Sequence, residues 1–475
     1  MSYLLLHLIF VLLIGYYLIT SLQFFSYRFS RIILHYTKPQ WHLYFFIFPV
    51  VCYFLTITFY PKLFVLIVVC LMVALFLWQK TLDKRLVFTY RVKSFFVILL
   101  LVTAFIDILI LSKIGQSAVL PLFLPLMVTF FISYSFEKYR LALFKKKALS
   151  KLNSMPNLKI IEITASFGKT SIKNYIYEIL KDDFKVYKTP RSVNTLNGLI
   201  KDINEELAFD REIYIAEAGA RQRGDIAEIT HFLRPHIVIV GEIGKQHIEY
   251  FKTIQNIRQT KLEALLSPRL KKAFLHSTTE KSDVDFYDKK LLDVSSTLDG
   301  LSFKFRDGKQ IYEFESPLLG KFNAYNLAVA IEVARYLGVD MQEIEKRVKK
   351  LTNPAHRLEK IESGGKIIID DSFNGNLSGM VASYELVSTF AGRKVIVTPG
   401  IVEATIEQNR ALIKKIDEVF DLVIVTGELN RELFKSLITK ELIVLHDKKE
   451  LVDTLAKKTK SGDLIIFSND APTYI

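Results

Sequence analysis

Hydrophobic positions divide the chain into two parts with different patterns. Up to residue 135 they form long apolar runs, most of them near the ~20 residues that a helix needs to cross ~30 Å of hydrocarbon, although the third and fifth are short. The first run is too long for a signal peptide and has no small-residue cleavage site, so it should be retained. The pattern predicts a bundle of five transmembrane helices, at Tyr3–Phe25, Trp41–Tyr60, Leu63–Trp78, Ser94–Leu111 and Ala118–Tyr134.

Beyond residue 157 the pattern changes to short buried strands that alternate with amphipathic helices. Such alternation is typical of α/β layers with mostly parallel sheets. A boundary is expected near Asn353-Pro354, between a charged helix and a new series of strands. We therefore predict a transmembrane region (1–150), a central domain (151–354) and a Rossmann-like C-terminal domain (355–475). The predicted strands are Ile160–Thr164, Ile213–Glu217, His236–Val240, Ile367–Asp370, Val395–Thr398, Leu422–Thr426 and Leu464–Phe467.

Charge and cysteine content exclude several classes of function. The first 150 residues hold fifteen Lys and Arg against three acids, so this region carries +12 of the total charge of +14. The remaining residues are nearly neutral, which argues against a nucleic-acid partner. Both cysteines, Cys52 and Cys70, lie in apolar runs, so the soluble part has no disulfide framework or cysteine zinc site. No obligate protein partner is evident.

The basic residues also predict an orientation. Three Lys and Arg lie between the first two runs, five between the third and fourth, and five after the fifth, whereas the opposite loops hold only Lys62 and Lys113. The positive-inside rule then places the residues after Tyr134 in the cytoplasm, on a multi-pass protein of the inner membrane. Asp107 is the one acid within a run, and it indicates either a function or a side chain that reaches the membrane interface.

One segment carries a recognisable chemistry. Gly168-Lys169-Thr170 follows a buried strand and opens a helix, which is the setting of a phosphate loop, although Ile163 occupies the first glycine position of the full pattern. In such a loop, backbone N–H groups hold phosphate oxygens, the lysine reaches the terminal phosphates and the threonine hydroxyl binds Mg²⁺. The alternative is a turn of this composition by chance. We favour nucleotide binding because of the preceding strand.

The residues around this loop resemble those of the Mur ligases. Residues 164–171 are similar to the T-G-S-x-G-K-T-[ST] loop of that family, with Ala165 in place of a glycine. Further segments resemble the family in the same order along the chain: the Asn-rich loop at 194–198, Glu217-Ala218-Gly219, residues 244–249, Lys261, and residues 320–326.

The segment at residues 370–376 discriminates between members of that family. It follows His356-Arg357 and resembles the D-D-S-Y-N-A-N-P signature of the MurF type, with Leu377 in place of the proline. The resemblance implies an ATP-dependent ligase of cell-wall precursor synthesis, which adds D-Ala-D-Ala to UDP-MurNAc-tripeptide through an acyl phosphate. Here the membrane region stands where such enzymes have their first domain, so uridine recognition has no assigned residue.

The resemblance also implies roles for particular residues. ATP would be held by Ser166, Gly168, Lys169, Thr170, Ser171, Asn326, Arg357 and Asp371. Two Mg²⁺ ions would be bound by Thr170, Glu217, His247 and Lys261, the last as an anionic carbamate formed with CO₂. The catalytic residues would be Lys169, Lys261 and His247, and the substrates would contact Asn194, Thr195, Asn197, Asn374 and Asn376.

Each assignment has a structural alternative. Lys261 could be a solvated lysine on a helix, and Asn326 an amide on a helix surface. Arg357 could form a surface ion pair, and Asp371 could cap a turn. Two other functions also remain open: a phosphate-loop NTPase that powers or gates a transport or sensory module, and a Mur-like ligase that acts on a lipid-linked precursor.

Overall fold

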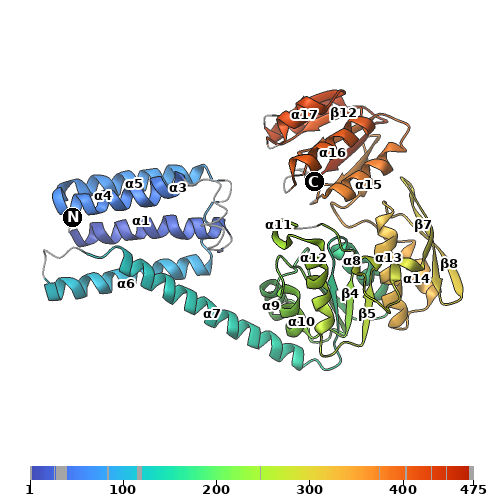
Figure 1. Ribbon diagram of the computed structural model, residues 1–475, viewed down its shortest axis with the longest axis horizontal. Coiled ribbons are helices and arrows are strands. Elements are labelled where there is room, and N and C mark those ends of the chain that lie inside the picture. Colours follow the sequence, from blue (N-terminus) through green and yellow to red (C-terminus); the bar gives the residue numbers. More distant parts are fainter. Residues whose placement is uncertain are drawn as a thin grey trace. The chain divides into compact units, whose positions relative to one another are not determined.

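The computed structural model divides the chain into two units, Met1–Lys146 and Lys147–Ile475 (Figure 1). Each unit is described by itself. The structure describes residues 3–25, 27, 40–82, 85–114, 120–245, 248–373, 375–401, 404–428, 430–445 and 447–469.

The described part of the N-terminal unit consists of helices joined by short irregular segments. Its helices are α1 (Tyr3–Phe24), α3 (Gln40–His42), a π-helical turn (Leu43–Ile47), α4 (Phe48–Phe59), α5 (Phe64–Lys80), α6 (Tyr90–Ile114) and the start of α7 (Phe123–Asn153). Four helical segments are long and apolar enough to cross a membrane: Tyr3–Phe24, Gln40–Phe59, Pro61–Lys80 and Tyr90–Lys113. They agree with the first four predicted spans.

The fifth predicted span is wrong. In the described part of the chain, α7 begins only at Phe123, and charged residues start at Glu137. The uncharged part of the helix is therefore about 14 residues, or roughly 21 Å at 1.5 Å per residue, which is too short for ~30 Å of hydrocarbon.

The side chain of Asp107 points into the helix bundle. The carboxylate is fully buried, and its Oδ2 lies 2.8 Å from Nδ1 of His7, which is equally buried on α1. The pair connects α1 to α6 within the apolar core of this unit. Ionisable groups inside an apolar bundle are costly unless paired, so the two residues stabilise each other there.

The second unit contains a five-stranded parallel sheet in the order β2-β3-β1-β4-β5. Parallel strands need crossover connections, and helices supply most of them. The strands are β1 (Lys159–Thr164), β2 (Val186–Lys188), β3 (Ile213–Glu217), β4 (Ile237–Val240) and β5 (Lys272–Leu275). The helices are α8 (Lys169–Leu180), α9 (Leu196–Glu205), α10 (Asp225–Leu233), α11 (Ile248–Phe251), α12 (Ile254–Leu262), α13 (Phe322–Tyr336) and α14 (Met341–Val348).

Successive residues of β1 pack into two different cores. Ile161 and Ile163 pack with α8 and α13, whereas Ile160 packs with α9, α10 and α12 on the opposite face (Figure 1). A strand covered on both faces reads as a continuous apolar run, which is why the sequence identified it. The carboxyl ends of β1 and β3 then meet at one edge of the sheet, where ligands bind in such folds.

A second, antiparallel sheet of three strands was not predicted. It consists of β6 (Leu291–Thr297), β7 (Gly300–Asp307) and β8 (Gln310–Ser316), in that order. Its residues alternate between buried and exposed positions, most regularly along β7.

The C-terminal part forms a six-stranded sheet in the order β13-β12-β11-β14-β10-β9, which is parallel except for β9. This confirms the prediction of a second, mostly parallel α/β layer. The strands are β9 (Glu359–Ser363), β10 (Lys366–Asp371), β11 (Lys394–Thr398), β12 (Leu422–Val425), β13 (Glu441–Val444) and β14 (Leu464–Ser468). The helices are α15 (Leu377–Ser388), α16 (Ile406–Val419), α17 (Arg431–Leu437) and α18 (Leu451–Lys458).

Candidate active site

The phosphate loop lies between β1 and α8, and contacts with neighbouring strands fix its path. Ser166 N–H donates to the carbonyl of Glu242 at 2.8 Å, and the Ser166 hydroxyl donates to the carbonyl of Gly244 at 3.1 Å. Gly168 has a φ of +78°, in the left-handed region that favours glycine, and a Cβ at this position would clash with Asn326. The loop therefore needs glycine at position 168, both for its left-handed backbone conformation and because a side chain would clash with Asn326.

Lys169, at the start of α8, is folded back onto this loop. Its Nζ donates to the carbonyl of Ala165 at 2.6 Å and to that of Ser166 at 3.3 Å. Burial lowers the pKa of Lys169 to about 8, while Glu217 opposes this shift and Arg357 adds to it. The Lys169 ammonium therefore lies at the end of the sheet, next to the loop that could bind an anion.

Glu217 ends β3 and is almost fully buried, with 1% exposure. One of its oxygens lies 2.6 Å from Nζ of Lys173, so the two residues form a buried ion pair. The other oxygen, Oε2, has no hydrogen-bond partner among the described residues. Buried polar atoms are normally satisfied, so Oε2 is the atom that can bind a further cationic or donor group.

Lys261, on α12, is not the solvated lysine of the structural alternative. Its exposure is 3%, and burial holds the pKa of Lys261 well below that of an ordinary lysine, with the Lys169 ammonium acting in the same direction. A buried lysine in this environment favours the neutral amine. A neutral amine is the form that reacts with CO₂ to give a carbamate.

These groups fit a Mg²⁺ site in part. The buried carboxylate of Glu217 supplies the hard anionic oxygen that Mg²⁺ prefers, and Thr170 follows Lys169 at the same loop. His247 lies outside the described residues. No three His, Cys, Asp or Glu side chains cluster as a metal site in the part of the chain that the structure describes. The expected Mg²⁺ ligands therefore include a hydroxyl, that of Thr170, and a modified lysine, Lys261.

The Asn-rich loop is attached to the end of β3. The carbonyl of Asn194 accepts a hydrogen bond from Gly219 N–H at 2.8 Å, and the Thr195 hydroxyl caps α9 by accepting from Gly198 N–H at 3.3 Å. Asn197 is exposed on the first turn of that helix. The structure therefore brings Asn194 to the site through its backbone, while Thr195 has a structural role as a helix cap.

Asn326 and Arg357 are not the surface residues of their structural alternatives. Asn326 is buried beside Gly168, where its amide donates to Asn323 Oδ1 at 3.0 Å. Arg357 is largely buried, with its guanidinium 4.5 Å above the ring of Phe373, and its charge reaches Lys169. The structure thus brings Asn326 and Arg357 toward the phosphate loop.

Asp371 ends β10 and receives a hydrogen bond from the Ser383 hydroxyl at 2.7 Å. Burial raises the pKa of Asp371 to about 6, although Ser383 and Arg357 oppose this shift. Asn376 caps α15 by accepting from Gly379 N–H at 3.0 Å, as a helix N-cap does. Ser171 is buried in the first turn of α8, and Asn374 lies outside the described residues.

Lys173 belongs to this site, and sequence reasoning missed it. It lies one helical turn after Lys169, at 1% exposure, and besides its contact with Glu217 it donates to the carbonyl of Arg191 at 2.5 Å. The spacing of four residues places both lysines on one face of α8, which was a signal that could have identified it.

The amino-acid sequence is similar to those of several bacterial ligases. The chain is 26% identical over 333 residues to the UDP-N-acetylmuramoyl-tripeptide–D-alanyl-D-alanine ligase of Bacillus subtilis, which covers 65% of this chain and 72% of the relative. It is 27% identical over 341 residues to the ligase of the same name from Borreliella burgdorferi, which covers 65% and 71%.

Solved structures show the same fold. The MurF structure from Acinetobacter baumannii matches with a TM-score of 0.61 and 20% identity, over 70% of this chain and 78% of that one. MurF from Thermotoga maritima, in complex with ADP, matches with a TM-score of 0.58 and 24% identity, over 70% and 80%.

Two family models match the second unit. Residues 163–334 match the Mur ligase middle domain, and residues 356–469 match the Mur ligase glutamate ligase domain. The long apolar helices of the N-terminal unit lie outside both matches. The chain therefore belongs to the Mur ligase family of ATP-dependent ligases.

Proposed function

We propose that this protein joins D-Ala-D-Ala to the peptide of a muramoyl tripeptide, with the consumption of one ATP. The proposal is supported by the convergence of a phosphate loop, a buried carboxylate at Glu217 and a buried Lys261 at one edge of a parallel sheet. The names of the curated relatives support this choice of substrates.

The chemistry begins with phosphoryl transfer. The terminal carboxylate of the donor peptide attacks the γ-phosphorus of ATP, the bond to the bridging oxygen breaks, and ADP leaves with that electron pair. Lys169, once drawn away from the carbonyls of Ala165 and Ser166, would neutralise charge on the moving phosphoryl group. Arg357 adds a second cation that already acts on Lys169.

Amide formation follows. The amine of the incoming dipeptide attacks the carbonyl carbon of the acyl phosphate, inorganic phosphate leaves, and the amine loses its proton to solvent or a nearby base. Mg²⁺ held by Thr170 and Glu217, and a second ion held by His247 and carbamylated Lys261, would supply charge stabilisation for the phosphoryl group. Asn326 would contact the nucleotide. Asp371, at the end of β10 in the C-terminal sheet, would also bind the nucleotide.

The apolar helices indicate membrane anchoring, and we propose that the catalytic unit lies on the cytoplasmic side of the inner membrane, where ATP is available. The donor would be UDP-MurNAc-tripeptide, or a lipid-linked precursor with the same peptide. Purified full-length protein with ATP and each donor, with and without D-Ala-D-Ala, tests the proposal. A new amide product should form only when donor, acceptor and ATP are all present.

A further inference from the structure

Beside the phosphate loop, a groove with a volume of about 390 Å³ runs between α8 and β2. We call it the β2 groove. It is lined by Thr170, Asn174 and Tyr177 on one face of α8, by all of β2, by the loop that ends at Arg191, and by Arg211 before β3. Since Thr170 is also a residue of the phosphate loop, the groove opens onto the site where phosphoryl transfer is proposed.

The lining of the groove is basic. It includes Lys188, Arg191 and Arg211 but no acidic side chain. Lys188 Nζ donates to Asn174 Oδ1 at 2.7 Å and lies 4.2 Å from the ring of Tyr177. Among the described residues, no carboxylate lies within ion-pair distance of Lys188 or Arg191. Their charges are therefore available to an anionic ligand.

Arg211 is the third cation of the lining, and its side chain is 36% exposed. Its Nε has no hydrogen-bond partner in the described part of the chain and lies 3.6 Å from the carboxylate of Asp210, which is an ion-pair distance. Arg191 is held in place by its backbone, because its carbonyl accepts from the buried Lys173. Arg191 follows β2 and Arg211 precedes β3, and since these two strands are parallel neighbours, the two cations lie toward opposite ends of the strands.

The backbone of β2 favours a peptide over other anions. β2 is the edge strand of its sheet, so one side of its backbone has no strand partner there. An extended peptide can pair with such an edge. From Thr170 to Tyr177 the helix rises roughly 10 Å, a length that about three residues of an extended strand would span.

We infer that the β2 groove binds the donor as an extended acidic peptide of about three residues, parallel to β2, with its reactive carboxylate at Thr170 and its other negative groups facing Arg191 and Arg211. This inference rests on the proposed function and names the part of the protein that recognises the donor.

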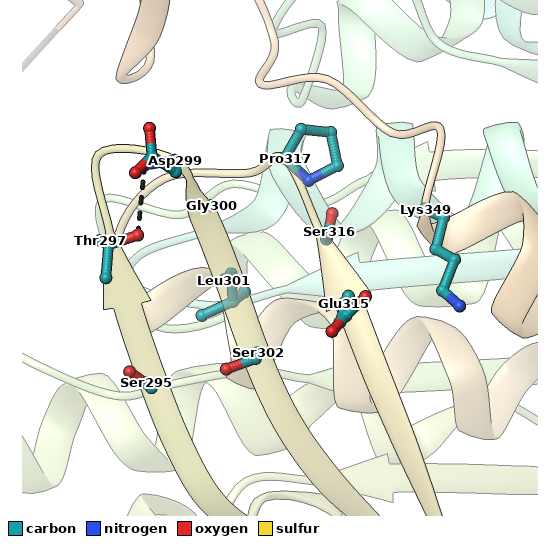
Figure 2. A pocket seen from close by; sticks show the side chains of 10 residues that line it. All are labelled: Ser295, Thr297, Asp299, Gly300, Leu301, Ser302, Glu315, Ser316, Pro317 and Lys349. Carbon is teal, nitrogen blue, oxygen red and sulfur yellow. Dashed lines mark hydrogen bonds between the residues drawn. The ribbon is translucent and has the colours of Figure 1, made fainter.

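A second hollow, of about 370 Å³, lies on the three-stranded sheet (Figure 2). It differs from the β2 groove because acidic side chains and Lys349 line it and no phosphate-loop residue does.

Donor kinetics of the full-length protein in detergent test this inference. Arg211→Gln and Arg191→Gln should each raise the donor KM roughly tenfold to a hundredfold, the value of a lost charge-assisted hydrogen bond. The KM for ATP and kcat at saturating donor should stay within about twofold. Arg306→Gln, which removes the same charge from an exposed site on β7, is the matched control and should change none of these values. An unchanged donor KM in both groove variants, or an equal rise in the KM for ATP, would overturn the inference.

Direct binding separates this inference from the proposed reaction. Calorimetry should show that the free tripeptide binds the wild-type protein and the control, but binds Arg211→Gln at least about tenfold more weakly. Uridine diphosphate should not share this dependence on Arg211. If the variant loses affinity for uridine diphosphate and not for the peptide, the groove recognises the nucleotide part and our peptide assignment is wrong. If the peptide binds as expected but no donor yields an amide, the proposed function fails while the groove assignment stands.

Discussion

The pair formed by Lys173 and Glu217 allows a quantitative prediction. Both side chains are 1% exposed, and the charged atoms are 2.6 Å apart. At an effective dielectric constant of ~20, two unit charges at this distance attract by about 6 kcal/mol, most of which offsets the loss of hydration. Removing one partner leaves the other charge buried. We therefore expect Glu217→Gln and Lys173→Met each to destabilise the surrounding structure by about 3 kcal/mol.

Hydrogen exchange can measure this loss locally, in peptides from α8 and β3, without assuming two-state unfolding of a multidomain protein. The double variant should cost less than the sum of the single variants by about 2 kcal/mol, because it leaves no unpaired charge. If the two effects are additive, or if each single variant loses less than about 0.5 kcal/mol of stability, the ion pair does not stabilise the structure as its geometry implies.

The same variants also separate a metal ligand from a purely structural ion pair. In Glu217→Gln, Mg²⁺ should no longer increase nucleotide affinity, whereas Lys173→Met keeps the carboxylate and should still respond to Mg²⁺. If Mg²⁺ strengthens nucleotide binding equally in both variants and the wild type, Glu217 does not bind the ion.

Three further predictions concern charge and location. Lys169→Ala should lower kcat at least about a hundredfold by removing charge stabilisation, and a variant that retains more than about a tenth of wild-type activity would contradict this role. Because the pKa of Lys169 is about 8 and only its protonated form is cationic, nucleotide affinity of the free protein should be highest below pH 8 and fall as the pH rises through that value; the Lys169→Ala variant should lack this decline. Lys261→Ala should fold but lose activity, with partial recovery when a small carboxylic acid replaces the missing carbamate, and full activity in this variant would refute the role of Lys261. A reporter fused after Lys147 should be active only in its cytoplasmic form, because the catalytic unit needs ATP, and activity of the external form alone would contradict the proposed location.

The sequence predicted seven of the ten parallel strands in the described part of the chain, most of which are buried along their length and read as short apolar runs, but it missed β2, β5 and β13, which are partly exposed. β1 and β3 were predicted within one residue of their observed ends. The antiparallel sheet was missed, because its half-exposed strands carry polar residues at every second position. The fifth span was predicted from an apolar run, and the structure shows a helix whose uncharged part is too short.

For the candidate site, the sequence identified the residue types but not their partners. The phosphate loop was predicted because a strand, a glycine and a lysine occur in that order. The structure adds that Asn326 lies against this glycine, Gly168. Lys173 was overlooked because a lysine within an amphipathic helix is usually solvated. Its burial depends on Glu217, which comes more than forty residues later in the chain. Such pairings over a long sequence separation depend on the fold and not on a local pattern.

In the proposed reaction, ATP is consumed only when an amide is formed. The most direct test follows ADP release and peptide product together on purified full-length protein, with UDP-MurNAc-tripeptide and D-Ala-D-Ala added singly and together. The ligase account predicts one ADP per amide formed, and negligible ADP without either partner. Steady ATP hydrolysis that needs neither substrate would contradict it and would favour an NTPase that drives the membrane helices.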